Sequence, residues 1–158
     1  MNILLYSNDK KGVGKKIQGV IKSMVPKIEL EIYRTLDGLS DKLRQPRYSS
    51  FILVLLAARR EDLWALTSIR DLLCDIPIIF ILPDSEKDIV LTAHKFYPRY
   101  VTYVSSDFTD VALVIKKMFK NTYSKRMLAI EKSETKNSSF RKPTLQQSSE
   151  KGGNIQDV

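Results

Sequence analysis

The hydrophobic pattern of the chain alternates between short apolar runs and stretches with helical spacing. Residues 51–57 are continuously apolar and rich in branched side chains, and polar residues flank them on both sides. A run of this length is typical of a strand buried on both faces. Residues 76–82 form a second such run, and residues 3–6 form a shorter one. These three segments are predicted to be the central strands of a parallel sheet.

The remaining apolar segments predict the edges of the sheet and its helices. Residues 28–33 alternate strictly between apolar and polar, which is typical of an edge strand, and residues 100–105 alternate in part. Helical spacing predicts helices over residues 15–25, 37–43, 63–73 and 85–97, and a last helix from Ser106 or Thr109 onward. Five strands alternating with five helices predict a doubly wound, three-layer α/β fold with strand order 2-1-3-4-5, the flavodoxin-like arrangement.

The last helix has an apolar spacing that outlasts the predicted domain, residues 1–121. The spacing continues through Tyr123, Met127 and Ile130, beyond what is needed to cover the sheet. Residues 122–131 are therefore expected either to fray or to offer an apolar stripe to a partner helix. Residues 132–158 are rich in Ser, Lys, Gln, Asn and Gly with scattered charge, and this composition predicts a disordered tail.

Composition and charge narrow the function classes. No apolar run approaches the ~20 residues that span a bilayer, and residues 1–6 do not resemble a signal peptide. The single Cys74 excludes an internal disulfide framework, so we expect a cytoplasmic protein. The net charge of +8 favours an acidic partner. Because the charge is divided between residues 10–16, the last helix and the tail, nucleic-acid binding is a less favoured alternative.

With these elements in place, the chain resembles the receiver domain of two-component response regulators over roughly residues 1–120. The segments 2–9, 43–56, 76–82 and 100–108 carry the resemblance, together with the order of the elements. Receivers accept a phosphoryl group on an Asp that ends the third strand. Two acidic residues after the first strand hold Mg²⁺, and a Ser or Thr and a Lys at the ends of the fourth and fifth strands contact the phosphoryl oxygens.

At the corresponding positions this sequence lacks that chemistry. Ala57 stands where the acceptor belongs. The positions that match the other phosphorylation-site residues are Ser7, Asn8, Asp9, Leu82 and Ser106 or, in a shifted register, Tyr103. Alanine cannot be phosphorylated, and one carboxylate beside lysines is a poor Mg²⁺ site. The resemblance therefore implies a degenerate receiver that is not an enzyme, holds no metal or cofactor and acts independently of phosphorylation.

An aromatic and basic cluster at residues 96–100 supplies a candidate interaction surface. In receivers the face made by the fourth helix, fifth strand and fifth helix is the usual surface for dimers and partners, and aromatic residues with Arg commonly anchor interfaces. We expect a protein partner or a second copy of the chain to bind there. The candidate residues are Phe96, Tyr97, Arg99, Tyr100 and Tyr103, extended by Tyr123, Met127 and Ile130.

The loop at residues 10–16 offers an alternative function. It follows a strand and opens a helix, which is the setting in which Gly-rich loops bind phosphates. Lys11, Gly12, Gly14 and Lys15 are the candidate anion-binding residues, but Lys16 replaces the hydroxyl residue that binds Mg²⁺ in P-loops. The alternative is an anion- or nucleotide-binding protein, and the simpler interpretation is a solvated basic loop.

Overall fold

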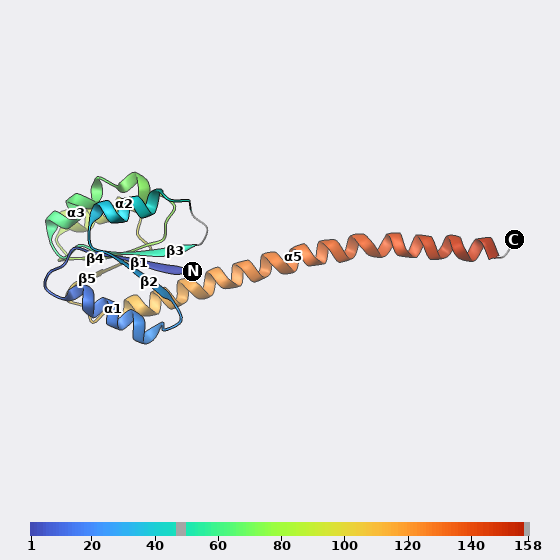
Figure 1. Ribbon diagram of the computed structural model, residues 1–158, viewed down its shortest axis with the longest axis horizontal. Helices are drawn as coiled ribbons and strands as arrows, with labels where there is room; N and C mark the ends of the chain where they lie inside the picture. The colour runs from blue at the N-terminus through green and yellow to red at the C-terminus, as the bar shows by residue number, and fades with distance from the viewer. Residues whose placement is uncertain (47–49, 157–158) are drawn as a thin grey trace. The chain divides into compact units, whose positions relative to one another are not determined.

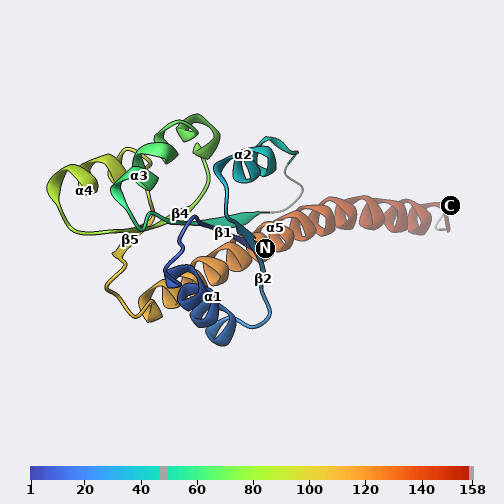
Figure 2. The ribbon, with the colours of Figure 1, turned by 60° about the vertical axis from the view of Figure 1, so that its left-hand side comes forward.

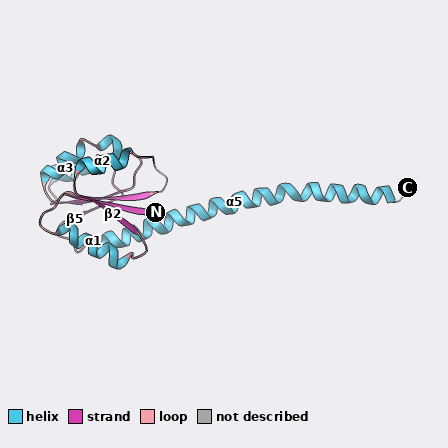
Figure 3. Cartoon of the chain, in the orientation of Figure 1, coloured by secondary structure: helices cyan, strands magenta, loops and turns pink. Residues whose placement is uncertain are grey.

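The structure, a computed structural model, describes residues 1–46 and 50–156, and from residue 136 onward it describes the backbone alone. Strands and helices alternate along the chain (Figures 1 and 3). The strands are β1 (Asn2–Ser7), β2 (Glu29–Tyr33), β3 (Phe51–Leu56), β4 (Ile78–Leu82) and β5 (Tyr100–Tyr103). The helices are α1 (Val13–Met24), α2 (Leu36–Arg44), α3 (Arg60–Thr67), the 3₁₀ helix η1 (Arg70–Leu73), α4 (Lys87–His94) and α5 (Thr109–Gln156).

The sheet has the order β2-β1-β3-β4-β5, and every neighbouring pair is parallel. This confirms the predicted α/β fold and strand order. The strands predicted to be central, β1, β3 and β4, are buried along almost their whole length. Helices α2, α3 and α4 cover one face of the sheet, and α1 and the first turns of α5 cover the other (Figure 2). The register aligns Ser7 with Leu56 and Leu82 with Tyr103, so the carboxyl ends of the strands share one edge.

The chain divides into two compact units, Met1–Lys117 and Met118–Val158. The first unit contains the sheet, and the second is the remainder of α5 with the residues that follow it. The predicted boundaries after residues 121 and 131 fall inside this helix and stay predictions. Most of the predicted disordered tail, residues 132–158, lies outside the residues whose side chains are described. That expectation also stays a prediction.

The helix predicted over residues 63–73 is two elements, and it begins earlier than expected. The backbone N–H of Arg59 donates to the Asp62 carboxylate (3.0 Å), which fixes the start of α3 at Arg60. At the other end, the hydroxyls of Thr67 and Ser68 donate to carbonyls three residues earlier, at 2.5 and 2.7 Å. Such bonds compete with the backbone hydrogen bonds that would continue the helix. The chain becomes helical again only after Ile69, in the 3₁₀ helix η1.

Two further boundaries differ from the prediction because polar side chains and turns intervene. The Asp84 carboxylate accepts the N–H of Glu86 at 2.9 Å, so residues 84–86 form a turn and α4 begins at Lys87 rather than near Ser85. Strand β5 ends at Tyr103 because the N–H of Ser106 donates to the Tyr103 carbonyl and turns the chain.

Candidate functional site

The carboxyl edge of the sheet presents no nucleophile at the position that corresponds to a receiver's acceptor. Ala57 directly follows β3 and is fully buried, and its N–H donates to the Ile81 carbonyl at 2.9 Å. Leu82, which ends β4, is also fully buried. The Ser106 hydroxyl accepts the N–H of Phe108 and donates to Asp110, so it is engaged in the turn before α5. These three positions therefore serve packing and local hydrogen bonding.

Asp9 is engaged by the backbone of its own loop. One carboxylate oxygen accepts the N–H of Lys11 at 2.8 Å, and the other accepts those of Val13 (2.5 Å) and Gly14 (3.3 Å). Burial acts to raise the pKa of Asp9, but these backbone donors outweigh it and hold the pKa below its ordinary value. Because both oxygens already accept hydrogen bonds, and the neighbouring Lys10 is cationic, the residues at this edge do not fit a Mg²⁺ ion.

Two different local constraints explain why glycine stands at positions 12 and 14 of the loop. Gly12 precedes α1 with a φ of 90°, in the left-handed region that glycine tolerates best. A Cβ at Gly14 would lie 2.3 Å from Oγ of Ser7, so α1 packs so closely against the end of β1 that a side chain at this position would force Ser7 to shift. Ser7 is 2% exposed, and within the described residues its Oγ is the one buried side-chain polar atom without a hydrogen-bond partner.

The candidate anion-binding residues lie around this loop, but the backbone N–H groups of Lys11 and Gly14 already donate to Asp9. A pocket of about 360 Å³ adjoins the loop and is bordered by the cations Lys10, Lys15 and Arg34. Gly12 and Gly14 also line it, whereas Lys11 meets the Asp9 carboxylate through its N–H. An external anion would have to displace the Asp9 carboxylate to reach the N–H groups of Lys11, Val13 and Gly14.

A second carboxylate near this edge, Asp62, was not among the predicted residues. It is 4% exposed, and its carboxylate accepts hydrogen bonds from the backbone N–H of Arg59 and, at 3.2 Å, from the Arg59 guanidinium. Burial, and secondarily the charge of Asp62, raise the pKa of the buried Tyr6. The sequence carried no clear signal for this role, because Arg59 is not among the residues that usually open a capping box. Its contacts assign it to helix capping.

The predicted interaction residues of the first unit divide into core and surface. Phe96 is 6% exposed and packs edge-to-face on Phe80, with ring centroids 5.3 Å apart. Its ring therefore belongs to the core rather than to an accessible surface. Tyr97 is 88% exposed, and Arg99 is exposed beside it.

The two tyrosines of β5 are half-buried. The Tyr100 hydroxyl donates to the Asp110 carboxylate at 2.6 Å and ties β5 to α5. This hydrogen bond, and secondarily desolvation, raise the pKa of Tyr100. Tyr103 packs against the hydrophobic core with part of its ring accessible. Both residues can contribute only the exposed part of their rings to a contact with another molecule.

The apolar stripe of the second unit is accessible along the helix. Tyr123, Met127 and Ile130 are exposed large hydrophobic side chains, and Leu128 is a fourth that the helical spacing did not select. Exposed apolar side chains at these spacings are compatible with a helical partner. The prediction of a partner helix stays a prediction.

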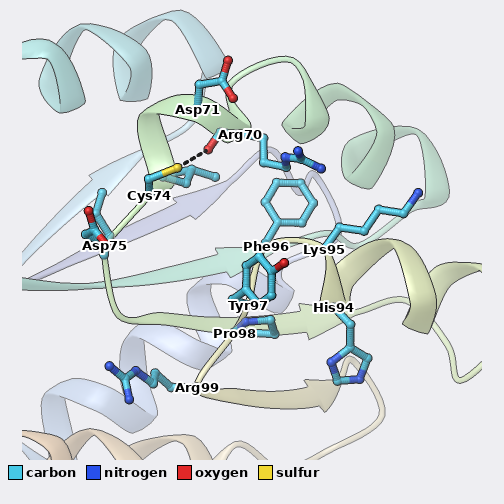
Figure 4. A pocket seen from close by; sticks show the side chains of 12 residues that line it. Arg70, Asp71, Cys74, Asp75, His94, Lys95, Phe96, Tyr97, Pro98 and Arg99 are labelled. Carbon is cyan, nitrogen blue, oxygen red and sulfur yellow. Dashed lines mark hydrogen bonds between the residues drawn. The ribbon is translucent and has the colours of Figure 1, made fainter.

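A pocket of about 880 Å³ lies at the opposite, amino edge of the sheet (Figure 4). Its walls come from η1 and the chain before β4, and from the end of α4 and the chain before β5. The lining residues are Arg70, Asp71, Leu73, Cys74, Asp75, Ile76, His94, Lys95, Phe96, Tyr97, Pro98 and Arg99. The sequence predicted an interaction role for residues 96–99 but gave no sign of the other wall. The two segments lie some twenty positions apart and come together only once β4 and β5 pair in parallel.

Comparisons with known proteins add a fold likeness. No family model and no curated protein matches the chain. A solved structure described as the yeast Spc42 trimeric coiled coil, amino acids 181–211, fused to another protein is similar with a TM-score of 0.55. The two chains share 17% identity over 88% of this chain and 95% of that one. At this identity the likeness concerns the fold alone.

The described residues bear on the expectations about membranes and metals. Within them, no helix combines the length and the apolar character that a membrane crossing requires. The same residues contain no cluster of three or more His, Cys, Asp or Glu side chains suited to a metal ion.

Proposed function

We propose that the chain is a receiver-like regulatory module that binds proteins and works independently of phosphorylation. The observation that carries this proposal is the fully buried methyl group of Ala57 at the end of β3. Phosphoryl transfer to a receiver needs a carboxylate nucleophile at this point and a divalent cation beside it. The chain has a methyl group at the first position and, at the second, a carboxylate saturated by backbone donors.

The surface proposed for partners is the face formed by α4, β5 and the first turns of α5. Leu91 in α4 and Leu113 in α5 are exposed apolar side chains on the two helices that flank β5. Strand β5 itself adds the partly accessible ring of Tyr103. Apolar side chains bordered by polar ones are the usual composition of a protein contact. The occupant proposed here is a protein partner or a second copy of the chain.

The first experiment tests independence from phosphorylation. Amide spectra of the ¹⁵N-labelled chain are recorded with Mg²⁺ alone and then with Mg²⁺ and beryllofluoride, which mimics a phosphoryl group. We expect the two spectra to be the same. A saturable shift of amides near Ala57 or Asp9 would contradict the proposal, because it would reveal a working acceptor site.

The second experiment tests the surface through self-association. Sedimentation of the full chain is compared with Leu113→Glu and with the control Trp64→Glu, whose side chain is similarly exposed on α3. If the second copy is the occupant, Leu113→Glu shifts the chain to monomer and Trp64→Glu does not. A concentration-dependent dimer that survives Leu113→Glu would place self-association elsewhere.

The loop at residues 10–16 does not enter the proposed function. Its glycines are explained by local backbone conformation and packing, and its N–H groups bind the Asp9 carboxylate. This geometry supports the simpler interpretation of a solvated basic loop around an internal anion.

A further inference from the structure

The pocket at the amino edge of the sheet has one wall with an excess of positive charge. Lys95 and Arg99 stand on this wall, whereas Arg70 on the other wall is accompanied by Asp71 and Asp75. Figure 4 shows the two carboxylates on the side of Cys74, away from Lys95. Within the described residues, no salt bridge includes Arg70, Lys95 or Arg99. These cations are therefore available to carboxylates from outside the chain.

Tyr97 stands at the rim of this pocket in a strained conformation. Its N–H donates to the His94 carbonyl at 3.0 Å, and its φ of 52° is left-handed, as at the end of a helix where glycine is the usual residue. The side chain is 88% exposed, so burial within the chain does not offset the strain. An exposed aromatic residue held in an unfavourable conformation points to a contact with another molecule.

The mixture of residues indicates the chemical class of that molecule. The volume, about 880 Å³, holds several side chains rather than one ion. Tyr and Arg are among the residues that are enriched in protein contacts. A nucleic acid carries a negative charge at every nucleotide and would bring some of these charges against Asp71 and Asp75. A protein segment can place carboxylates at Lys95 and Arg99 and uncharged side chains opposite the two aspartates, which favours a protein segment over a nucleic acid.

We propose that this pocket binds an acidic segment of a partner protein, with carboxylates against Lys95 and Arg99 and an apolar side chain against Tyr97. The inference deepens the proposed function and rests on it, because it gives the protein partner a second contact and a chemistry. It also separates this contact from the face formed by α4, β5 and α5.

The test uses a synthetic peptide of alternating Glu and Leu as the acidic probe. Amide shifts of the ¹⁵N-labelled full chain are followed during titration with this peptide, with a matched Gln and Leu peptide, and with a single-stranded DNA of equal charge. We expect saturable shifts at the amides of Asp75, Tyr97 and Arg99 with the acidic peptide, and affinity at least about tenfold lower for the Gln peptide.

Three variants test the assignment of residues. Glycine suits the left-handed backbone at this position, so Tyr97→Gly should remain folded as judged by circular dichroism. Its affinity for the acidic peptide should fall about tenfold or more. Arg99→Ala should lower the affinity for the acidic peptide and make that affinity less dependent on salt concentration. Lys27→Ala is the control: it removes another exposed lysine, outside the pocket, and should leave the affinity unchanged.

Several results would overturn the inference. They are the absence of shifts with the acidic peptide, shifts confined to residues outside the pocket, equal losses for Lys27→Ala and Arg99→Ala, or tighter binding of the DNA. None of these results touches the proposed function, which fails instead if beryllofluoride perturbs the amides near Ala57. The two failures are therefore distinguishable.

Discussion

The close approach of α1 to β1 at Gly14 and Ser7 makes a quantitative prediction about stability. Ser7→Ala removes a buried hydroxyl that lacks a hydrogen-bond partner. A buried unsatisfied polar group costs about 1–3 kcal/mol, so this substitution should raise the free energy of unfolding by about 1 kcal/mol. The direction is unusual, because most substitutions at buried positions destabilise a protein.

Gly14→Ala should act in the opposite direction. The new methyl group would lie 2.3 Å from Oγ of Ser7, far inside van der Waals contact. Overpacking of this kind costs about 1–3 kcal/mol, and the better helix propensity of alanine returns up to about 1 kcal/mol. We expect a net loss of about 1–2 kcal/mol. In the double variant the nearest atom is Cβ of Ser7 at 3.1 Å, so most of the clash disappears.

The two substitutions should therefore be coupled by about 2 kcal/mol in a double-mutant cycle. Urea unfolding followed by Trp64 fluorescence and circular dichroism measures each variant. Gly19→Ala is the matched control, because a Cβ at this exposed glycine of α1 meets no atom within 4 Å and should stabilise through helix propensity alone. Additive effects, or a destabilising Ser7→Ala, would refute the reasoning.

Three other predictions follow from the loop and the last helix. Asp9 has a lowered pKa in the folded chain, so its contribution to stability is present above its unfolded pKa of about 4 and is lost as the pH falls through the folded value. Asp9→Asn should flatten acid unfolding curves measured by circular dichroism, and unchanged curves would contradict this. Calorimetry with ATP and GTP should give no binding heat, whereas micromolar binding abolished by Lys15→Ala would restore the anion-binding alternative. Removal of residues 122–158 should reduce capture of partner proteins in a pull-down, and equal capture would exclude the stripe as a contact.

The sheet was predictable from the sequence because strand burial leaves a direct pattern. Continuously apolar runs at residues 51–57 and 76–82 mark strands with two covered faces, and alternation at residues 28–33 marks an edge. Several element ends were not predictable from apolar spacing. They depend on single hydrogen bonds, such as those of Thr67 and Ser68, which end α3 in the middle of a continuous apolar stripe.

The candidate site was predictable in part for the same physical reason. Parallel strands bring their carboxyl ends to one edge, so the place of Ala57 and Leu82 followed from the strand order. The amino-edge pocket did not, because Arg70 and Lys95 belong to two separate helical segments whose ends line one pocket only once β4 and β5 pair in parallel. The burial of Phe96 was also ambiguous, because an aromatic residue beside a tyrosine and an arginine suits either a core or an interface.

The loop that follows β1 shows how one arrangement can resemble two functions. Its acidic residue corresponds to the metal-binding region of receivers, and its glycines and lysines resemble a phosphate-binding loop. In the folded chain these features belong to one local arrangement: backbone N–H groups at the start of α1 bind the Asp9 carboxylate, Gly12 permits the turn, and Gly14 permits the close packing. Because the Asp9 carboxylate and these N–H groups already bind one another, the carboxylate needs no cation and the N–H groups need no phosphate. The loop therefore gives no independent reason to assign catalysis to this chain, and the case for binding rests on the surfaces that leave strain and charge exposed.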